Sequence, residues 1–216
     1  MLLGMGGLGC PAALALARTG VEHMVLVDPD VVSLSNLQRQ ILFRPADVGL
    51  PKTEVAARRL RAWFPSLSIE SLPVRLDAEN DLLRVLAGVH IFLDGSDNFA
   101  TRFLSNDMSC RSGVALVHGA VLGWRGQVMA IVPGRGPCLR CLFGGPPQEE
   151  GPVCAQAGVV GAVAGEVGER MAALARAVVS GREIIWNRGL FTLDAATMRR
   201  RWVPVPSGAG CVCQRI

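Results

Sequence analysis

Short apolar runs alternate with longer helix-forming segments along the first 118 residues. Most of these runs lack the polar alternation of a half-exposed strand, which is typical of a parallel sheet buried on both faces. The runs lie at residues 1–3, 23–27, 67–72, 89–93 and 115–118, and the predicted helices at 12–18, 52–64, 78–87 and 99–110. This alternation predicts an α/β fold with a right-handed, doubly wound and mostly parallel sheet.

The pattern changes after about residue 123. Three strand-like runs and one long helical segment follow, at residues 127–132, 190–193, 201–205 and 167–179, respectively. They predict a mixed C-terminal extension of the sheet. Neither an internal repeat nor a low-complexity linker divides the chain, so we expect a single domain over residues 1–216.

Composition and charge exclude several classes of protein. Half of the residues are hydrophobic and 19% are charged, which is typical of a globular domain. No apolar stretch reaches the length of a membrane span, and the N-terminus lacks the pattern of a secretory signal. The densest basic run, at residues 199–201, has no interleaved aromatics, so we interpret it as a solvated or subunit-facing strand edge. We therefore expect a cytoplasmic protein that binds neither membrane nor nucleic acid.

A Gly-x-Gly-x-x-Gly loop joins the first predicted strand to the first helix. Its glycines are Gly4, Gly6, Gly7 and Gly9. Glycines at these offsets permit a tight turn, close approach of the backbone to a phosphate and close helix–strand packing, as in Rossmann-like nucleotide-binding folds. The loop therefore predicts a nucleotide phosphate at the helix N-terminus, without identifying the nucleotide.

Asp28 ends the second predicted strand, 19 residues after the last glycine of the loop. An acidic residue at this place accepts hydrogen bonds from a nucleotide ribose. The alternative is an aspartate that only caps the turn before Pro29. At this point a nicotinamide dehydrogenase is also compatible with the sequence.

The next polar stretch argues against a dehydrogenase. Asn36, Arg39 and Gln40 share one face if the stretch is helical, and Lys52 begins the following predicted helix. A cation at a helix N-terminus opposes the helix dipole, and binding to triphosphate oxygens would explain its presence there. The alternative is a surface loop with ordinary charges.

Residues 28–43 resemble the ThiF/MoeB/HesA family, which are bacterial relatives of the ubiquitin-activating enzymes. The resemblance continues through Asp-Gly-Ser-Asp-Asn at 94–98, Gly-Gln at 126–127 and Cys-Leu-Arg-Cys at 138–141. It covers essentially the whole chain, and the MoeB-like branch is slightly favoured.

The resemblance implies an ATP-dependent adenylyltransferase acting on a ubiquitin-like sulfur-carrier protein of the MoaD or ThiS type, in molybdenum-cofactor (molybdopterin) or thiamine biosynthesis. The reacting group would be the carrier's C-terminal Gly-Gly carboxylate, which has a pKa of about 3.5 and needs no general base. Catalysis would then rest on positioning and charge neutralisation. Residues 1–123 would bind the nucleotide, and 124–216 would bind the carrier and zinc.

The family's site residues transfer onto matching positions of this sequence. Asp28 would bind the ribose, Asn36, Arg39, Gln40 and Lys52 the phosphates, and Asp97 the Mg²⁺ ion. For Asp97 the alternative is a helix N-cap before Phe99. Because no rhodanese domain is fused to this sequence, a separate sulfur donor is expected, and the family is expected to form a homodimer.

Four of the seven cysteines resemble the family's structural zinc site, which would join the C-terminal tail to the middle of the chain. They are Cys138, Cys141, Cys211 and Cys213. The family's second pair is Cys-x-x-Cys, whereas this chain has Cys-Val-Cys. The alternative is therefore a strained chelating turn and a metal-free tail.

The other three cysteines have different expected roles. Cys154 matches a cysteine on a mobile loop over the family's active site, where some relatives join it covalently to the carrier. The alternative is a bystander, because no basic residue lies nearby in sequence to lower its pKa. Cys10 and Cys110 are interpreted as packing residues.

Two departures from the family favour a competing function. Relatives carry an N-terminal segment of a few dozen residues with an arginine that reaches the partner subunit's ATP site, and this sequence begins after that point. The first predicted strand is also short. Together with the Cys-x-Cys spacing, these departures favour a non-catalytic or impaired relative that binds ATP or a ubiquitin-like protein without turnover.

Overall fold

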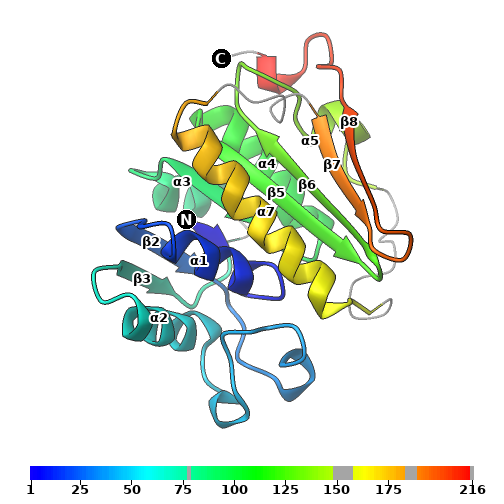
Figure 1. The fold of residues 1–216 in the computed structure, drawn as a ribbon. Coiled ribbons are helices and arrows are strands. Elements are labelled where there is room, and N and C mark those ends of the chain that lie inside the picture. Colours follow the sequence, from blue (N-terminus) through cyan, green and yellow to red (C-terminus); the bar gives the residue numbers. More distant parts are fainter. Residues whose placement is uncertain (77–78, 148–157, 183–188, 215–216) are drawn as a thin grey trace.

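The computed structural model describes residues 1–76, 79–147, 158–182 and 189–214. Its centre is one eight-stranded sheet with the order β3-β2-β1-β4-β5-β6-β7-β8 (Figure 1). The first five strands of this order pair in parallel, and β6, β7 and β8 add three antiparallel pairings. The predicted fold class, a doubly wound and mostly parallel α/β sheet with a mixed C-terminal extension, is confirmed.

The strand order reverses between β1 and β4, which is the switch point where doubly wound sheets bind ligands. At this point Leu3 pairs with both Val27 and Asp94, so the chain leaves β1 between the carboxyl ends of its two neighbours. The strands are β1 Leu2–Leu3, β2 His23–Val27, β3 Ser68–Leu72, β4 Ile91–Asp94, β5 Ala115–Leu122, β6 Arg125–Ile131, β7 Gly189–Asp194 and β8 Arg199–Pro204.

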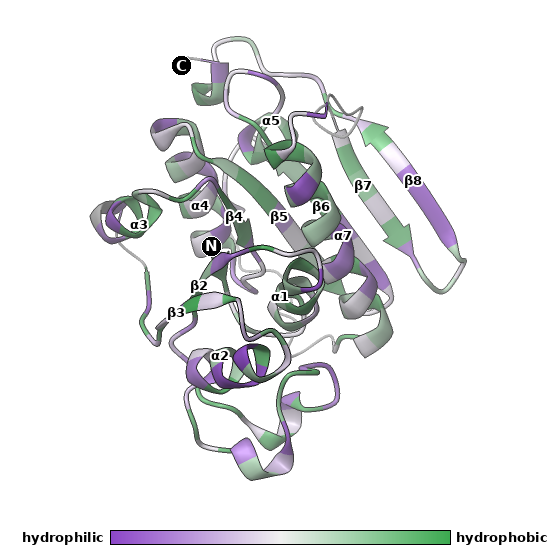
Figure 2. Ribbon diagram, turned by 60° about the vertical axis from the view of Figure 1, so that its left-hand side comes forward, coloured by the Kyte–Doolittle hydropathy of each residue, from purple (hydrophilic) through white to green (hydrophobic). Residues whose placement is uncertain are grey.

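Helices cover both faces of the sheet and enclose two hydrophobic cores (Figures 1 and 2). One core lies under α1, α2 and α7, and the other lies under α3, α4 and α5. The α-helices are α1 Gly9–Ala17, α2 Lys52–Trp63, α3 Glu79–Leu86, α4 Phe99–Ser112, α5 Leu139–Phe143 and α7 Gly161–Val179. Short 3₁₀ helices are η1 Leu34–Asn36, η2 Pro45–Asp47 and η4 Val212–Gln214.

The helix α7 begins at Gly161, six residues before the predicted start at 167. Glycines lower helix propensity and so concealed the first turns. Close packing explains why they are present. A Cβ on Gly161 would lie 2.9 Å from the Gln38 carbonyl oxygen, and one on Gly168 would lie 2.6 Å from the Leu8 carbonyl oxygen.

Two further expectations concern single elements. The helix α1 begins at Gly9 rather than at residue 12 and places Pro11 within its first turn, where no intrahelical N–H bond is required. Cys10 and Cys110 are buried, at 0% and 2% exposure, which confirms them as packing residues. Among the described residues, no helix has the length and apolar character needed to cross a membrane.

Candidate active site

The glycine loop requires glycine at both ends. Gly4 has φ +90°, and its N–H donates to the Val27 carbonyl at 2.8 Å, which fixes the loop against β2. A Cβ on Gly9 would lie 1.9 Å from the Gly4 carbonyl oxygen. By contrast, a Cβ on Gly6 would meet only the Gln40 amide, at 3.9 Å, so the loop leaves an open cradle at its centre. In the described structure no side chain caps α1, and Gly6, Gly7 and Leu8 of the loop before it line a cavity. The N–H groups of such a loop at a helix N-terminus can bind an anion.

Asp28 holds the glycine loop from the end of β2. It is 4% exposed, and its two carboxylate oxygens accept the Met5 N–H at 2.6 Å and the Asp30 N–H at 2.8 Å. Burial raises the pKa of Asp28, although the nearby Lys52 ammonium opposes this shift. Asp28 therefore has the turn-capping role given above as the alternative, and it also lines the cavity beside the glycine loop, which is compatible with the ribose role.

Lys52 is the first residue of α2 and is 4% exposed. Its ammonium lies 2.7 Å from an Asp30 carboxylate oxygen and 3.9 Å from one of Asp28. Lys52 is therefore a buried cation at a helix N-terminus, and two carboxylates offset the unfavourable interaction with the helix dipole.

The segment of Asn36, Arg39 and Gln40 is not a regular helix. The 3₁₀ helix η1 ends at Asn36, whose carbonyl then accepts the N–H groups of Arg39 and Gln40, both at 3.1 Å. These turns still bring the three side chains together, and Arg39 donates to the Asn36 amide oxygen at 2.8 Å. Gln40 is 2% exposed, and its amide oxygen has no hydrogen-bond partner in the described structure. A buried amide without a partner fits a site that is completed by a polar ligand.

These residues line one cavity of about 350 Å³. It extends from the glycine loop past Asp28 and Lys52 to the loop before α4. There Asp97 is exposed at the rim, and the N-cap of α4 is Asn98, whose side chain accepts the Thr101 N–H at 2.8 Å. The N-cap alternative for Asp97 is therefore wrong.

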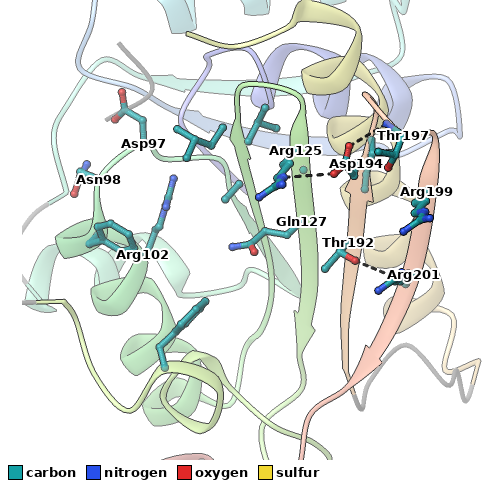
Figure 3. Close-up of a pocket in the computed structure, with 17 residues that line it drawn as sticks. Asp97, Asn98, Arg102, Arg125, Gln127, Thr192, Asp194, Thr197, Arg199 and Arg201 are labelled. Carbon is teal, nitrogen blue, oxygen red and sulfur yellow. Dashed lines mark hydrogen bonds and ion pairs between the residues drawn. The ribbon is translucent and has the colours of Figure 1, made fainter. Parts of the chain in front are cut away.

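A second cavity of about 630 Å³ continues from the first across the open face of β6, β7 and β8 (Figure 3). The two cavities share Asp97, Asn98, Arg102 and Val121. Arg102 donates to the Ser96 carbonyl at 3.1 and 3.2 Å, which supports the loop that carries Asp97. A chain lying in the second cavity would thus reach the first cavity at these shared residues.

The sequence analysis missed a buried hydrogen-bonded pair beneath this loop. Asp94 and His118 are 0% and 1% exposed, and the His118 Nδ1 lies 3.2 Å from one carboxylate oxygen of Asp94. The other oxygen accepts the Ser96 N–H at 3.0 Å. Burial alone would raise the pKa of Asp94, but the hydrogen bonds from His118 and Ser96 outweigh it, and the pKa is lowered. The sequence did hold a signal for this pair, since Asp94 and His118 each lie in or at the end of an apolar strand. The carboxyl ends of neighbouring parallel strands meet at one edge of the sheet, where side chains from both strands can come together.

The four cysteines predicted to bind zinc lie together, with all of their sulfur atoms within 4.8 Å of one another. The Sγ–Sγ distances from Cys138 to Cys141 and Cys211 are 3.9 and 3.6 Å, and that from Cys141 to Cys213 is 3.5 Å. A tetrahedron with Zn–S bonds of about 2.3 Å has edges of roughly 3.8 Å, so the cluster fits zinc. The shorter Cys-Val-Cys spacing does not separate the thiols, because the 3₁₀ helix η4 turns the second pair inward. Cys154 lies outside the described residues.

Fold and site together define a doubly wound α/β protein with a glycine-loop anion site at the switch point of its sheet. The family model described as the ThiF family matches residues 1–213, and the chain belongs to this family.

Individual relatives agree with this assignment. The SAMP-activating enzyme E1 of Haloferax volcanii is 43% identical over 216 residues, which cover 99% of this chain and 79% of the relative. The sulfur carrier protein ThiS adenylyltransferase of Escherichia coli is 38% identical over 217 residues, covering 99% and 84%. The crystal structure of E. coli MccB with MccA-N7isoASN has a TM-score of 0.85 at 21% identity, covering 99% of this chain and 66% of that one, which shows the shared fold.

Proposed function

We propose that this protein is an ATP-dependent adenylyltransferase that activates the C-terminal Gly-Gly carboxylate of a ubiquitin-like sulfur carrier. The observation that carries the proposal is the junction of the two cavities at Asp97, Asn98 and Arg102. The first cavity has the glycine loop and buried charges of a nucleotide site. The second is an open groove that gives a polypeptide tail access to it.

The proposed chemistry needs no proton transfer. A carboxylate oxygen of the carrier's last glycine attacks the α-phosphorus of ATP and forms a new P–O bond. The bond from the α-phosphorus to the oxygen that bridges it to the β-phosphate breaks, and pyrophosphate leaves with that electron pair. Since the carboxylate is already ionised, the protein has to position two anions and neutralise their charge.

The residues of the first cavity fit these tasks. The backbone N–H groups of the glycine loop and the side chains of Asn36, Arg39 and Lys52 would bind phosphate oxygens. The Gln40 side-chain amide would complete this set by donating through its Nε2, and Asp28 would orient the ribose. Mg²⁺ would supply charge neutralisation between the phosphates, with Asp97 as its protein ligand.

Names of relatives support the substrate class, because those relatives are called activating enzymes or adenylyltransferases of carrier proteins. We further propose a homodimer and a separate sulfur donor, in molybdenum-cofactor or thiamine biosynthesis. A cytoplasmic location fits the described cysteines, none of which forms a disulfide. A covalent role for Cys154 belongs to the same proposal.

The decisive experiment is ATP–pyrophosphate exchange in the presence of a carrier that ends in Gly-Gly. We expect exchange that requires the carrier and is lost when its last glycine is removed. Asp97→Ala, Arg39→Ala and Lys52→Met should each reduce the exchange rate at least about 100-fold, the scale of losing one positioned charge in an active site. Carrier binding without exchange would instead identify the non-catalytic relative.

A further inference from the structure

The arginine run of the outermost strand is divided between the two faces of the sheet. Side chains alternate along a strand, so Arg199 and Arg201 share one face and Arg200 lies on the other. Arg200 donates two hydrogen bonds to Glu166 of α7, at 2.8 and 2.9 Å. Arg199 and Arg201 line the second cavity instead (Figure 3).

Strand register builds two polar rows across this face. Arg125 of β6 lies beside Asp194 of β7, which lies beside Arg199 of β8. In the same way Gln127, Thr192 and Arg201 form the second row, as the labelled side chains in Figure 3 show. Asp194 is already engaged, since it lies 3.5 Å from Arg125 and accepts the Thr197 N–H at 3.1 Å.

The groove therefore has an excess of positive charge. Among its described lining residues are four arginines, Arg102, Arg125, Arg199 and Arg201, and two aspartates, Asp97 and Asp194. Arg199 and Arg201 are exposed and form no ion pair with any described residue. Figure 2 shows the hydrophilic first part of β8, to which Arg200 on the other face also contributes.

Protection of the sheet edge is the simpler explanation for arginines on an outermost strand, because charges discourage pairing with another chain. That role is served by charge anywhere along the strand. Edge protection gives no reason for two unpaired arginines to line a groove that opens into the nucleotide cavity. A ligand that lies in the groove and carries negative charge does give one.

We infer that the groove recognises acidic side chains in the carrier's C-terminal segment, upstream of its Gly-Gly end, through Arg199 and Arg201. This inference rests on the proposed function and names the chemistry of its substrate. The junction of the two cavities positions the main chain of the carrier's Gly-Gly end, and with it the reacting carboxylate. Arg199 and Arg201 determine which carrier tails bind. Because both arginines are exposed, each contributes modestly to affinity, and salt screens the contribution.

Synthetic peptides test this inference directly. We would use fluorescein-labelled 12-residue peptides that end in Gly-Gly and carry either two glutamates, two glutamines or two lysines among the residues upstream. Peptide binding is measured by anisotropy, and ATP–pyrophosphate exchange is measured with each peptide. The glutamate peptide should bind roughly three- to tenfold more tightly than the glutamine peptide, and the lysine peptide should bind most weakly.

The double variant Arg199→Glu/Arg201→Glu should reverse the order of the glutamate and lysine peptides without changing the KM for ATP. Arg84→Glu is the matched control, because Arg84 is an exposed arginine of α3 outside the groove. Equal affinities for the three peptides, or a preference that survives the double variant, would overturn the inference. If exchange occurs equally with all peptides, the proposed function stands and the inference fails. If no Gly-Gly peptide or carrier gives exchange, the enzymatic proposal fails, whatever the order of the peptide affinities.

Discussion

The parallel and antiparallel parts of the sheet use charge in opposite ways. In the parallel part, Asp28, Lys52, Asp94 and His118 are at most 4% exposed, and each is held by a defined hydrogen bond or ion pair. In the antiparallel part, the arginines of β8 are exposed. Buried charges are fixed before a ligand arrives, whereas exposed charges act weakly on a ligand that varies. The difference suggests that one part fixes the chemistry and the other selects the partner.

The largest effect on the free energy of unfolding is expected at the most closely packed position of the glycine loop. Gly9→Ala places a Cβ 1.9 Å from the Gly4 carbonyl oxygen, so the loop must leave β2 or α1 must shift. We expect a loss of about 4 kcal/mol or more in the free energy of unfolding, together with loss of ATP binding. Urea denaturation and calorimetric titration with ATP measure the two effects.

Gly165→Ala is the control for this prediction. Gly165 lies in α7, and a Cβ added there would meet no described atom within 4 Å, so the substitution should be neutral or stabilise by up to about 1 kcal/mol. Equal effects of the two alanines would show that the loop is not constrained by close packing.

In the antiparallel part, the cysteine cluster supplies the strongest constraint. Cys141→Ser should abolish zinc binding and lower the free energy of unfolding by about 3 kcal/mol, because a bound ion would join α5 to the C-terminal 3₁₀ helix. Mass spectrometry of the metal content and thermal unfolding are the measurements. Cys10→Ala, at a buried cysteine outside the cluster, should keep one zinc per chain. A wild-type protein without zinc would contradict the metal assignment.

Sequence alone predicted the parallel part well because its features are local. The glycine loop, Asp28 and Lys52 each lie beside a strand or helix end that the apolar pattern marks. The Asp94–His118 pair was missed because it depends on which strands are neighbours, and that order is set by tertiary packing over 24 residues.

The groove was beyond sequence reasoning for the same reason. Arg125, Asp194 and Arg199 form one row only through the register of three strands. The run at 199–201 looked like a single solvated edge, and only the alternation of faces in a known sheet separates Arg200 from its neighbours. Thus the spacing of residues in the sequence predicts groups of side chains that lie close along the chain. A recognition surface formed by several strands can be identified only when the pairing register of those strands is known.

The third prediction contrasts two buried carboxylates of the parallel part. The lowered pKa of Asp94 means that its charged form stabilises the folded protein. This stability is present above the ordinary pKa of 3.8 and is lost as the pH falls through the lower folded pKa. Asp94→Asn should therefore cost about 2 kcal/mol at pH 7 and less in strong acid.

The charge of Asp28 has the opposite effect on the free energy of unfolding. The pKa of Asp28 is raised, so its charged form opposes folding at neutral pH. Asp28→Asn should accordingly cost less at pH 7 than Asp94→Asn. Urea denaturation of both variants at pH 7 and in steps down to about pH 2 checks the comparison, because the Asp94 contribution is lost only below its ordinary pKa of 3.8. A cost for Asp94→Asn that does not change with pH would show that its charge is not what stabilises the fold.

The smallest effect tests whether exposed ion pairs of the antiparallel part contribute to stability at all. Arg200 and Glu166 form a two-point hydrogen-bonded pair, with side chains 42% and 29% exposed. A double-mutant cycle with Arg200→Gln and Glu166→Gln should give a coupling of about 0.5–1 kcal/mol in low salt. In 1 M salt, where the screening length is about 3 Å, the coupling should fall close to zero. A coupling of several kcal/mol that persists in salt would place this pair with the buried charges around Asp28 and Asp94, and the division between the two parts of the sheet would no longer hold.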